Sequence, residues 1–376
     1  MRLTARFGFI LAVLVASLAA AAAASASPGG GHGSGRVVFV LTDNTSGNQV
    51  VAYDRLGDGR LKAAGAYSTG GNGGILTGSV VDHTASQGAL TYDAADGLLF
   101  AVNPGSSTVS VFSASGDRLT LTQTIASGGT FPVSIDVHDG LVYVLNALAG
   151  GSVQGFRVDG DQLDSIAGSN RALGLDPNAA PQFTHTPGQV AFTPDGSRLV
   201  VTTKANGNAI DVFGVGTTGT LSATPVVNVE AGTVPFAVTF DAAGNLVVSE
   251  AGTNALATYS VNGDNTVTLL HRVTTGQAAT CWVATNGTYF YASNAGSGSE
   301  SGFAGGAGGA LTLLGATPTD PGTVDASATP DGAFLYVQGG KNGNVDGYRI
   351  NADGSLTAID SVTVPGAAGG EGIVAL

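Results

Sequence analysis

The sequence predicts an all-β fold, a seven-bladed β-propeller with four antiparallel strands per blade. Three observations lead to this prediction. One sequence unit occurs seven times, an opening strand without a successor follows the last unit, and the composition favours short strands joined by tight turns. Glycine is abundant, at 59 of 376 residues, and only 11% of residues are charged. Because 43% of residues are apolar, a disordered chain is not expected.

The repeated unit is clearest at its two central strands. In each copy an apolar run ends at a polar residue and a turn, and an alternating run then ends at an aromatic residue, as in "LLFAVNPGSSTVSVF" (98–112). These aromatic residues recur about every 45 residues, which is the length of a propeller blade. The closing residues are Tyr53, Phe112, Phe156, Phe213, Tyr259, Phe303 and Tyr348.

The other two strands of each unit flank this central pair. A Gly/Asp/Asn turn follows each aromatic residue and leads to an outer strand, and an opening strand ending in a turn such as "TPDG" precedes the apolar run. These turn residues tolerate the positive φ that short hairpins need. Two intervals are longer because they carry insertions at 71–86 and 167–184.

The first unit lacks an opening strand, and the C-terminus supplies one. The stretch "GGEGIVAL" (369–376) resembles the opening strands but has no successor. We expect it to join the first blade, which closes the ring and protects its strand edges. The alternative is a sandwich of two open sheets.

The chain divides into three parts. Residues 1–26 are interpreted as a secretory signal peptide, with a basic start, an apolar run from Phe7 to Ala24 and a small-residue cleavage site at 24–26. Residues 27–35 form a Gly/Ser-rich flexible lead-in, and residues 36–376 form the single propeller domain. The expected location is therefore secreted, or extracellular. The alternative is an uncleaved membrane anchor.

Charge and cysteine content limit the partners. The net charge is −13 with no basic cluster, so neither nucleic acid nor, after signal cleavage, a membrane is an expected partner. We expect a monomer that binds a small molecule or a glycan at the channel mouth. Cys281, the only cysteine, has apolar or small neighbours and is predicted to be a buried, unpaired thiol; the alternative is a reactive thiol.

One position per blade is a candidate for ligand binding. It lies at the end of the second strand, and we expect it to face the channel mouth, where ligand sites of closed β folds usually lie. Asparagine at a strand end also caps turns, so the asparagines are alternatively turn devices. Lys204 and Glu250 are the only charged members and alternatively form an ion pair. The equivalent residues are Asn44, Asn103, Asn146, Lys204, Glu250, Asn294 and Gly339.

The loops leading into the first strands add candidates on the same face. Glu250, His185 and Lys204 are predicted to converge as an acid–base site, with Glu250 as the general base. His83 belongs to the first insertion and could fold over the channel. The remaining loop candidates, proposed to bind substrate with the asparagines, are Gln189, Asp325 and Glu371.

No further chemical motif is present. The sequence lacks a G-x-S-x-G elbow, an H-E-x-x-H pair and a phosphate-binding loop. A carboxylate-lined channel could bind Ca²⁺, but the candidate carboxylates lie in separate blades. Neither a cofactor nor a metal is therefore predicted.

Repeats such as "TPDGSRLVVTTKANGNAIDVF" resemble the seven-bladed lactonase family, which includes propeller-type 6-phosphogluconolactonases and carboxymuconate cyclases. The resemblance covers Val37 to Leu376. It implies that His185, in "FTHTPGQVAFTPDG", and Glu250, in "NLVVSEAG", match residues that the family uses in its site. The family's Gly-Pro-Arg-His stretch is replaced by "TVPFAV", so the resemblance does not extend to binding of a phosphorylated or polycarboxylate substrate.

Two functions follow from this reading. The first is a secreted lactonase-like enzyme that hydrolyses or forms a lactone, with Lys204 or His185 stabilising charge. The second is a non-catalytic extracellular propeller that recognises a glycan, a peptide or an envelope partner. The fold does not choose between them, because propellers carry many functions.

Overall fold

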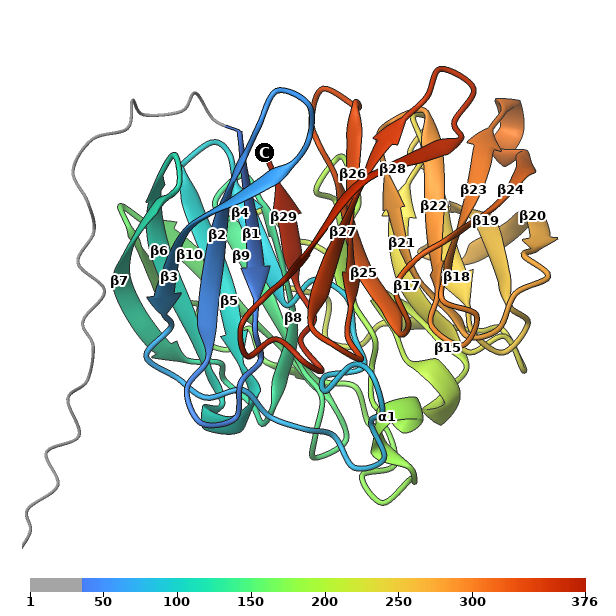
Figure 1. The fold of residues 1–376 in the computed structure, drawn as a ribbon. Coiled ribbons are helices and arrows are strands. Elements are labelled where there is room, and N and C mark those ends of the chain that lie inside the picture. The colour runs from blue at the N-terminus through green and yellow to red at the C-terminus, as the bar shows by residue number, and fades with distance from the viewer. Residues whose placement is uncertain (1–35) are drawn as a thin grey trace, which may run out of the picture. The chain divides into compact units, whose positions relative to one another are not determined.

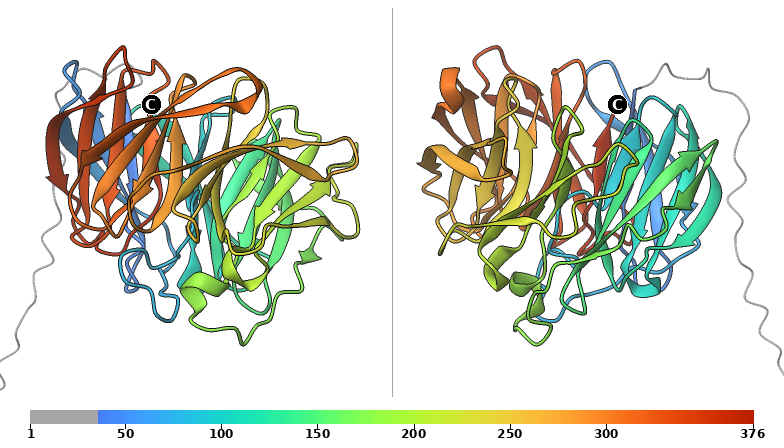
Figure 2. Two further views of the ribbon diagram at one scale, coloured as in Figure 1. Left: turned by 90° about the vertical axis from the view of Figure 1, so that its right-hand side faces the viewer. Right: turned by 180° about the vertical axis from the view of Figure 1, so that it is seen from behind.

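The computed structural model describes residues 36–376, so the expected signal peptide (1–26) and lead-in (27–35) lie outside the described residues. Seven sheets surround a common axis, as Figures 1 and 2 show from three sides. The predicted seven-bladed propeller is confirmed. Among the described residues, no helix combines the length and apolar character needed to cross a membrane.

Each blade is an antiparallel sheet whose strands follow one another from the channel outward. Blade one contains β29 (Ile373–Ala375), β1 (Val37–Leu41), β2 (Gln49–Arg55) and β3 (Leu61–Ser68). Blade two contains β4 (Leu90–Asp93), β5 (Leu98–Asn103), β6 (Thr108–Ser115) and β7 (Arg118–Ala126). Blade three contains β8 (Pro132–His138), β9 (Leu141–Asn146), β10 (Ser152–Asp159) and β11 (Gln162–Ser165), with β12 (Arg171–Ala172) also paired to β10.

The remaining four blades repeat this order. Blade four contains β13 (Val190–Phe192), β14 (Arg198–Thr202), β15 (Ala209–Gly214) and β16 (Val226–Val229). Blade five contains β17 (Pro235–Phe240), β18 (Leu246–Glu250), β19 (Ala255–Val261) and β20 (Val267–Thr274). Blade six contains β21 (Thr280–Thr285), β22 (Tyr289–Asn294), β23 (Ser299–Gly305) and β24 (Leu311–Pro318). Blade seven contains β25 (Thr323–Ala328), β26 (Phe334–Gly339), β27 (Asn344–Ile350) and β28 (Leu356–Thr363).

Within residues 36–376, helical segments are confined to loops. The helix α1 (Gln182–His185) belongs to the second insertion and precedes blade four. Short 3-10 turns follow β5, β14 and β23, at η1 (Pro104–Ser106), η2 (Lys204–Asn206) and η3 (Ala307–Gly309). Figure 1 shows α1 at the lower end of the propeller, opposite the C-terminus.

The C-terminal strand closes the ring as predicted. β29 pairs antiparallel with β1, in a register that places Phe39 opposite Val374. The Leu376 backbone N–H donates to the Val37 carbonyl at 2.7 Å, and Arg55 donates to the Leu376 carbonyl. Strands from both ends of the described chain therefore make up one blade.

Neighbouring blades are joined by apolar packing and by a recurring tyrosine contact. The second strands are almost fully buried, because both of their faces lie against other sheets. Three of their tyrosines donate to a carbonyl in the outer turn of the next blade: Tyr143 to Gly219, Tyr291 to Gly354 and Tyr336 to Gly59. A buried tyrosine hydroxyl needs such a partner, so the contact fixes the spacing between blades.

Removing the closing strand should destabilise the whole ring. We expect deletion of 369–376 to lower the melting temperature by roughly 10 °C or more, because burial of several apolar side chains, worth about 1.5–3 kcal/mol each, is lost. Deletion of 373–376 alone retains Glu371. Comparing the two truncations separates the effect of the strand on the melting temperature from the effect of the Glu371 carboxylate. A truncated protein that melts with the full-length protein in differential scanning calorimetry contradicts this closure.

Candidate functional site

The first insertion lies across the channel. The Gln87 side chain exchanges two hydrogen bonds of 2.9 Å with the backbone of Val283 in blade six. The Ser86 hydroxyl donates to Val133 of blade three, also at 2.9 Å. Since these blades are not neighbours in the ring, the insertion must span the space between their inner strands. This confirms the expectation that the first insertion folds over the channel.

A cavity of about 280 Å³ lies between this insertion, α1 and blades four to six. Its walls are mostly apolar, and Phe236 and Trp282 form an edge-to-face aromatic pair 5.0 Å apart. The polar side chains that line it are Asp82, Thr184, Lys204 and Cys281. The volume is close to the lower end of the range of about 300–1,000 Å³ for small-molecule pockets.

Lys204 is a buried cation at this cavity. Its Nζ donates to the Ala85 carbonyl at 2.6 Å, the Phe183 carbonyl at 2.7 Å and the Thr186 hydroxyl at 3.1 Å. An ammonium group has three N–H donors, so all of them are occupied. Burial lowers the pKa of Lys204 to about 7, and the nearby Asp82 charge opposes that shift. Lys204 thus joins both insertions to blade four and places positive charge beside the cavity.

Asp82 is the carboxylate of the cavity, and sequence reasoning missed it. Its Oδ1 accepts from the Thr84 backbone N–H and hydroxyl, both at 2.8 Å, and its Oδ2 accepts from the Ser86 N–H at 3.0 Å. The Ala85 backbone N–H also lies close to this carboxylate, so backbone and hydroxyl donors of its own loop surround Asp82. Burial raises the pKa of Asp82. The hydroxyl residues two and four positions after Asp82 were the available sequence signal.

Two predicted loop residues, Glu371 and Asp325, lie together behind Asp82. Glu371 Oε1 accepts from the Gly88 N–H at 2.9 Å, and the Ser86 hydroxyl lies 3.1 Å from Oε2. Asp325 and Glu371 are close enough to share a hydrogen bond. Burial raises the pKa of Glu371, and it raises the pKa of Asp325 to about 7. Neither residue lines the cavity, so their proposed contact with substrate has no direct geometric support.

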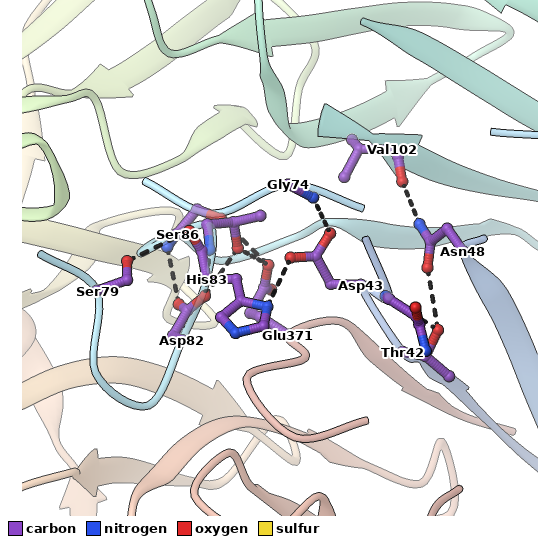
Figure 3. Close-up of polar contacts among 12 residues, drawn as sticks. Thr42, Asp43, Asn48, Gly74, Ser79, Asp82, His83, Ser86, Val102 and Glu371 are labelled. Atoms are coloured by element: carbon purple, nitrogen blue, oxygen red, sulfur yellow. Dashed lines mark hydrogen bonds and ion pairs between the residues drawn. The ribbon is translucent and has the colours of Figure 1, made fainter. Parts of the chain in front are cut away.

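The buried Asp43 and the partly buried His83 form a second pair beside this group, as Figure 3 shows. Asp43 Oδ1 accepts from the Gly74 N–H at 3.1 Å, and Oδ2 lies 3.5 Å from His83 Nδ1. The Asp43 carboxylate raises the pKa of His83. Burial raises the pKa of Asp43 to about 7. The pair attaches the insertion to blade one.

Glu250 does not face the cavity, contrary to expectation. Its carboxylate accepts two hydrogen bonds from Arg272, at 2.6 and 2.8 Å, and one from the Tyr259 hydroxyl at 2.5 Å. The alternative, an ion pair between Glu250 and Lys204, is also not formed, because Glu250 pairs with Arg272 on the outer strand β20. Only the next residue, Ala251, contributes to the cavity wall. Glu250 therefore holds its own blade together.

His185 is also directed away from the cavity. Its Nδ1 lies 2.8 Å from the Thr184 hydroxyl and 3.0 Å from the Pro181 carbonyl, within the turn that it ends. The preceding residues of α1, Phe183 and Thr184, line the cavity instead. Of the three residues predicted to converge, His185, Lys204 and Glu250, only Lys204 lines the cavity.

The predicted asparagines serve the strand ends. Asn103 bonds Thr108 and Ser110 through its amide, and Asn44 caps the following turn through Ser46. Asn146 and Asn294 make similar contacts. Gln189 accepts a hydrogen bond from the Val238 N–H at 2.6 Å, which joins blades four and five. The asparagines therefore act as turn devices, the alternative that the sequence left open. Neither they nor Gln189 line the cavity.

Cys281 is unpaired, as predicted, but only partly buried, because its side chain lines the cavity. Burial among apolar neighbours raises the pKa of its thiol to about 12, so the nucleophilic thiolate is scarce at neutral pH.

The cavity wall contains strained backbone. Lys204, Val234 and Ala279 adopt positive φ values of 50°, 52° and 56°. This conformation is a true outlier for a β-branched residue such as Val234. Such residues cost about 1–3 kcal/mol each and cluster at functional sites. Phe131, directly before β8 of blade three, has a φ of 64°, so at Val234 and Ala279 the conformation is a repeated feature of the entry to a blade.

The buried carboxyl groups predict an unusual pH dependence of stability. Burial raises the pKa of Asp325 to about 7 and of Glu300 to about 8, so between roughly pH 4 and 8 the folded protein holds protons that the unfolded chain has released. Stability should therefore fall as pH rises through this window. We expect the melting temperature to decrease from pH 5 to pH 8, and Glu300→Gln to raise it more at pH 8 than at pH 5. The exposed Asp360→Asn is the control, and an equal effect of Glu300→Gln at both pH values contradicts the assignment.

Comparison with known proteins places the chain in a family. The family described as "Lactonase, 7-bladed beta-propeller" matches residues 69–369. No curated protein matches the sequence.

Solved structures share the fold at low sequence identity. The periplasmic gluconolactonase PpgL of Pseudomonas aeruginosa has 18% identity and a TM-score of 0.68, covering 90% of this chain and 98% of its own. A protein from Lactobacillus plantarum has 22% identity and a TM-score of 0.69, covering 90% and 98%. A candidate 6-phosphogluconolactonase from Bacteroides uniformis has 18% identity and a TM-score of 0.70, covering 90% and 99%. The match to most of the chain, together with the observed seven blades, shows that the protein belongs to the seven-bladed β-propeller lactonase family.

Proposed function

We propose that the protein is a lactonase-like hydrolase and that its reaction takes place in the cavity beside Asp82 and Lys204. The observation that carries the proposal is the presence of a carboxylate and an ammonium group in one mostly apolar cavity of about 280 Å³. A low-dielectric surrounding strengthens the effect of both charges on a bound carbonyl group.

Asp82 suits a general base because it is the carboxylate that lines the cavity. Asp82 takes a proton from a bound water molecule while the water oxygen attacks the lactone carbonyl carbon. The positive charge of Lys204 stabilises the negative charge that develops on the carbonyl oxygen. The ring C–O bond then breaks, and the leaving oxygen takes the proton from Asp82, which yields a hydroxy acid. Burial raises the pKa of Asp82, which makes its carboxylate a stronger base.

A non-catalytic binding propeller is the second candidate. The observation in its favour is that all three N–H groups of Lys204 are occupied, so Lys204 acts on a ligand only through its charge. A ligand that binds in the cavity without turnover would support this function.

Secretion is part of the proposal, and it rests on the basic start, the apolar run and the small-residue site at 24–26. We expect the protein exported by its native host to begin at Ser27. Mass spectrometry of the intact secreted protein checks this, and an exported or membrane-bound protein that retains residues 1–26 contradicts it.

Replacing Asp82 tests the catalytic proposal. We expect Asp82→Asn to lower kcat by about 10²–10⁴-fold, because the base is removed. Hydrolysis is measured by proton release from a panel of lactones. Since Asp82 also orders its loop, melting temperature and circular dichroism are recorded for each variant. Thr84→Val, which removes one hydrogen bond to Asp82 but retains the base, should lower kcat far less. Full activity in Asp82→Asn refutes its role.

Glu250→Gln is the matched control at the residue expected from the sequence. The substitution weakens the buried pair with Arg272, so we expect a loss of roughly 2 kcal/mol of stability, less than for a fully buried pair because Arg272 is partly exposed. Turnover by the folded protein should stay within about twofold of the parent. A 100-fold loss of kcat with an unchanged melting temperature would instead support Glu250 as the base.

A further inference from the structure

We infer that the cavity binds an uncharged lactone with an apolar substituent, and that it excludes sugar lactones and their phosphorylated forms. This inference rests on the proposed function, because it names the ligand class of the same cavity. It follows from how few polar side chains line the cavity, which types they are, and how many of their hydrogen-bonding groups already have partners.

Among residues 36–376, the cavity wall offers no cationic side chain with a free donor. Lys204 is the only cationic side chain of this described wall, and its three N–H groups already bond Ala85, Phe183 and Thr186. The wall also contains the Asp82 carboxylate, and the protein carries a net charge of −13. A phosphate would therefore be desolvated beside a carboxylate without new hydrogen bonds, which is strongly unfavourable.

The cavity is equally unsuited to a polyol. Each buried hydroxyl group without a partner costs about 1–3 kcal/mol. Besides Lys204, the polar side chains of the wall are Asp82, Thr184 and Cys281, and the Thr184 hydroxyl already donates to the Pro181 carbonyl. A sugar ring with several hydroxyl groups would leave most of them unpaired.

The arrangement of the wall matches a molecule with one polar end. Asp82 and Lys204 come from the first insertion and from the turn after β14 of blade four. Blades five and six supply Val234, Phe236, Trp282 and Ala295, and Lys204 Nζ lies 5.2 Å from the centre of the Phe236 ring. A lactone carbonyl group fits beside Asp82 and Lys204, and an alkyl or aryl substituent fits along the apolar remainder of the wall, where burial contributes about 0.8 kcal/mol per CH₂.

The protein carries its own reporters of binding. Trp282 is the only tryptophan and Cys281 the only cysteine, and both line the cavity. Ligand binding should change the Trp282 fluorescence, and it should further slow the modification of Cys281 by an excess of thiol reagent, a reaction that is already slow because the thiolate is scarce. Neither readout requires turnover, so binding is measured independently of hydrolysis.

The test compares three probes: δ-decalactone, glucono-δ-lactone and 6-phosphogluconate. We expect only δ-decalactone to change the fluorescence and to protect Cys281. Ala295→Leu, which fills the cavity, should weaken this binding about tenfold or more. Ala358→Leu, the same change on the exposed outer strand β28, should leave it unchanged.

Binding of either polar probe with equal or greater affinity than δ-decalactone overturns the inference, as does the absence of binding by all three. Equal binding to the parent and Ala295→Leu proteins places the ligand elsewhere and also overturns it. If δ-decalactone binds in the cavity but is not hydrolysed, the ligand class stands and the hydrolase function fails.

Discussion

The buried carboxyl group of Glu371 is the contact on which ring closure and the candidate site both depend. It lies two residues before β29, and it bonds the backbone at the start of blade two and the hydroxyl groups of the first insertion. Closing the ring therefore also positions the segment that carries Asp82. Because Glu371 is fully buried, these hydrogen bonds offset a large desolvation penalty, and the raised pKa values nearby report that penalty.

The fold could be predicted because every blade has the same strand order and packs against its two neighbours in the same way. The closing aromatics, the turns and the C-terminal strand are local patterns, and each has one structural consequence in a closed ring. The site could not be predicted in the same way. Asp82 lies in an insertion without an equivalent in the other blades, so the repeat alignment gives no position for it.

Glu250 shows a second limit. Alignment of the repeats placed it correctly at the end of a second strand, but a strand position does not determine the partner of a side chain. Its partner Arg272 lies two strands away in the sheet, on β20 opposite Ala257, and it reaches Glu250 across β19. Glu250 thus has the strand position that the repeat alignment gave it, but its carboxylate forms a structural ion pair with Arg272.

The two ends of the described chain leave the propeller at one place. The backbones of Val37 and Leu376 are hydrogen-bonded, at the end of the ring opposite α1 (Figure 1). The cavity lies among the loops at the α1 end. A tether, a fused domain or a solid support attached at Leu376 would thus hold the propeller with its cavity end turned outward. On a sensor surface, for example, the orientation of the propeller would follow from the position of its attachment point, and no contact between the propeller and the surface would be needed to set it.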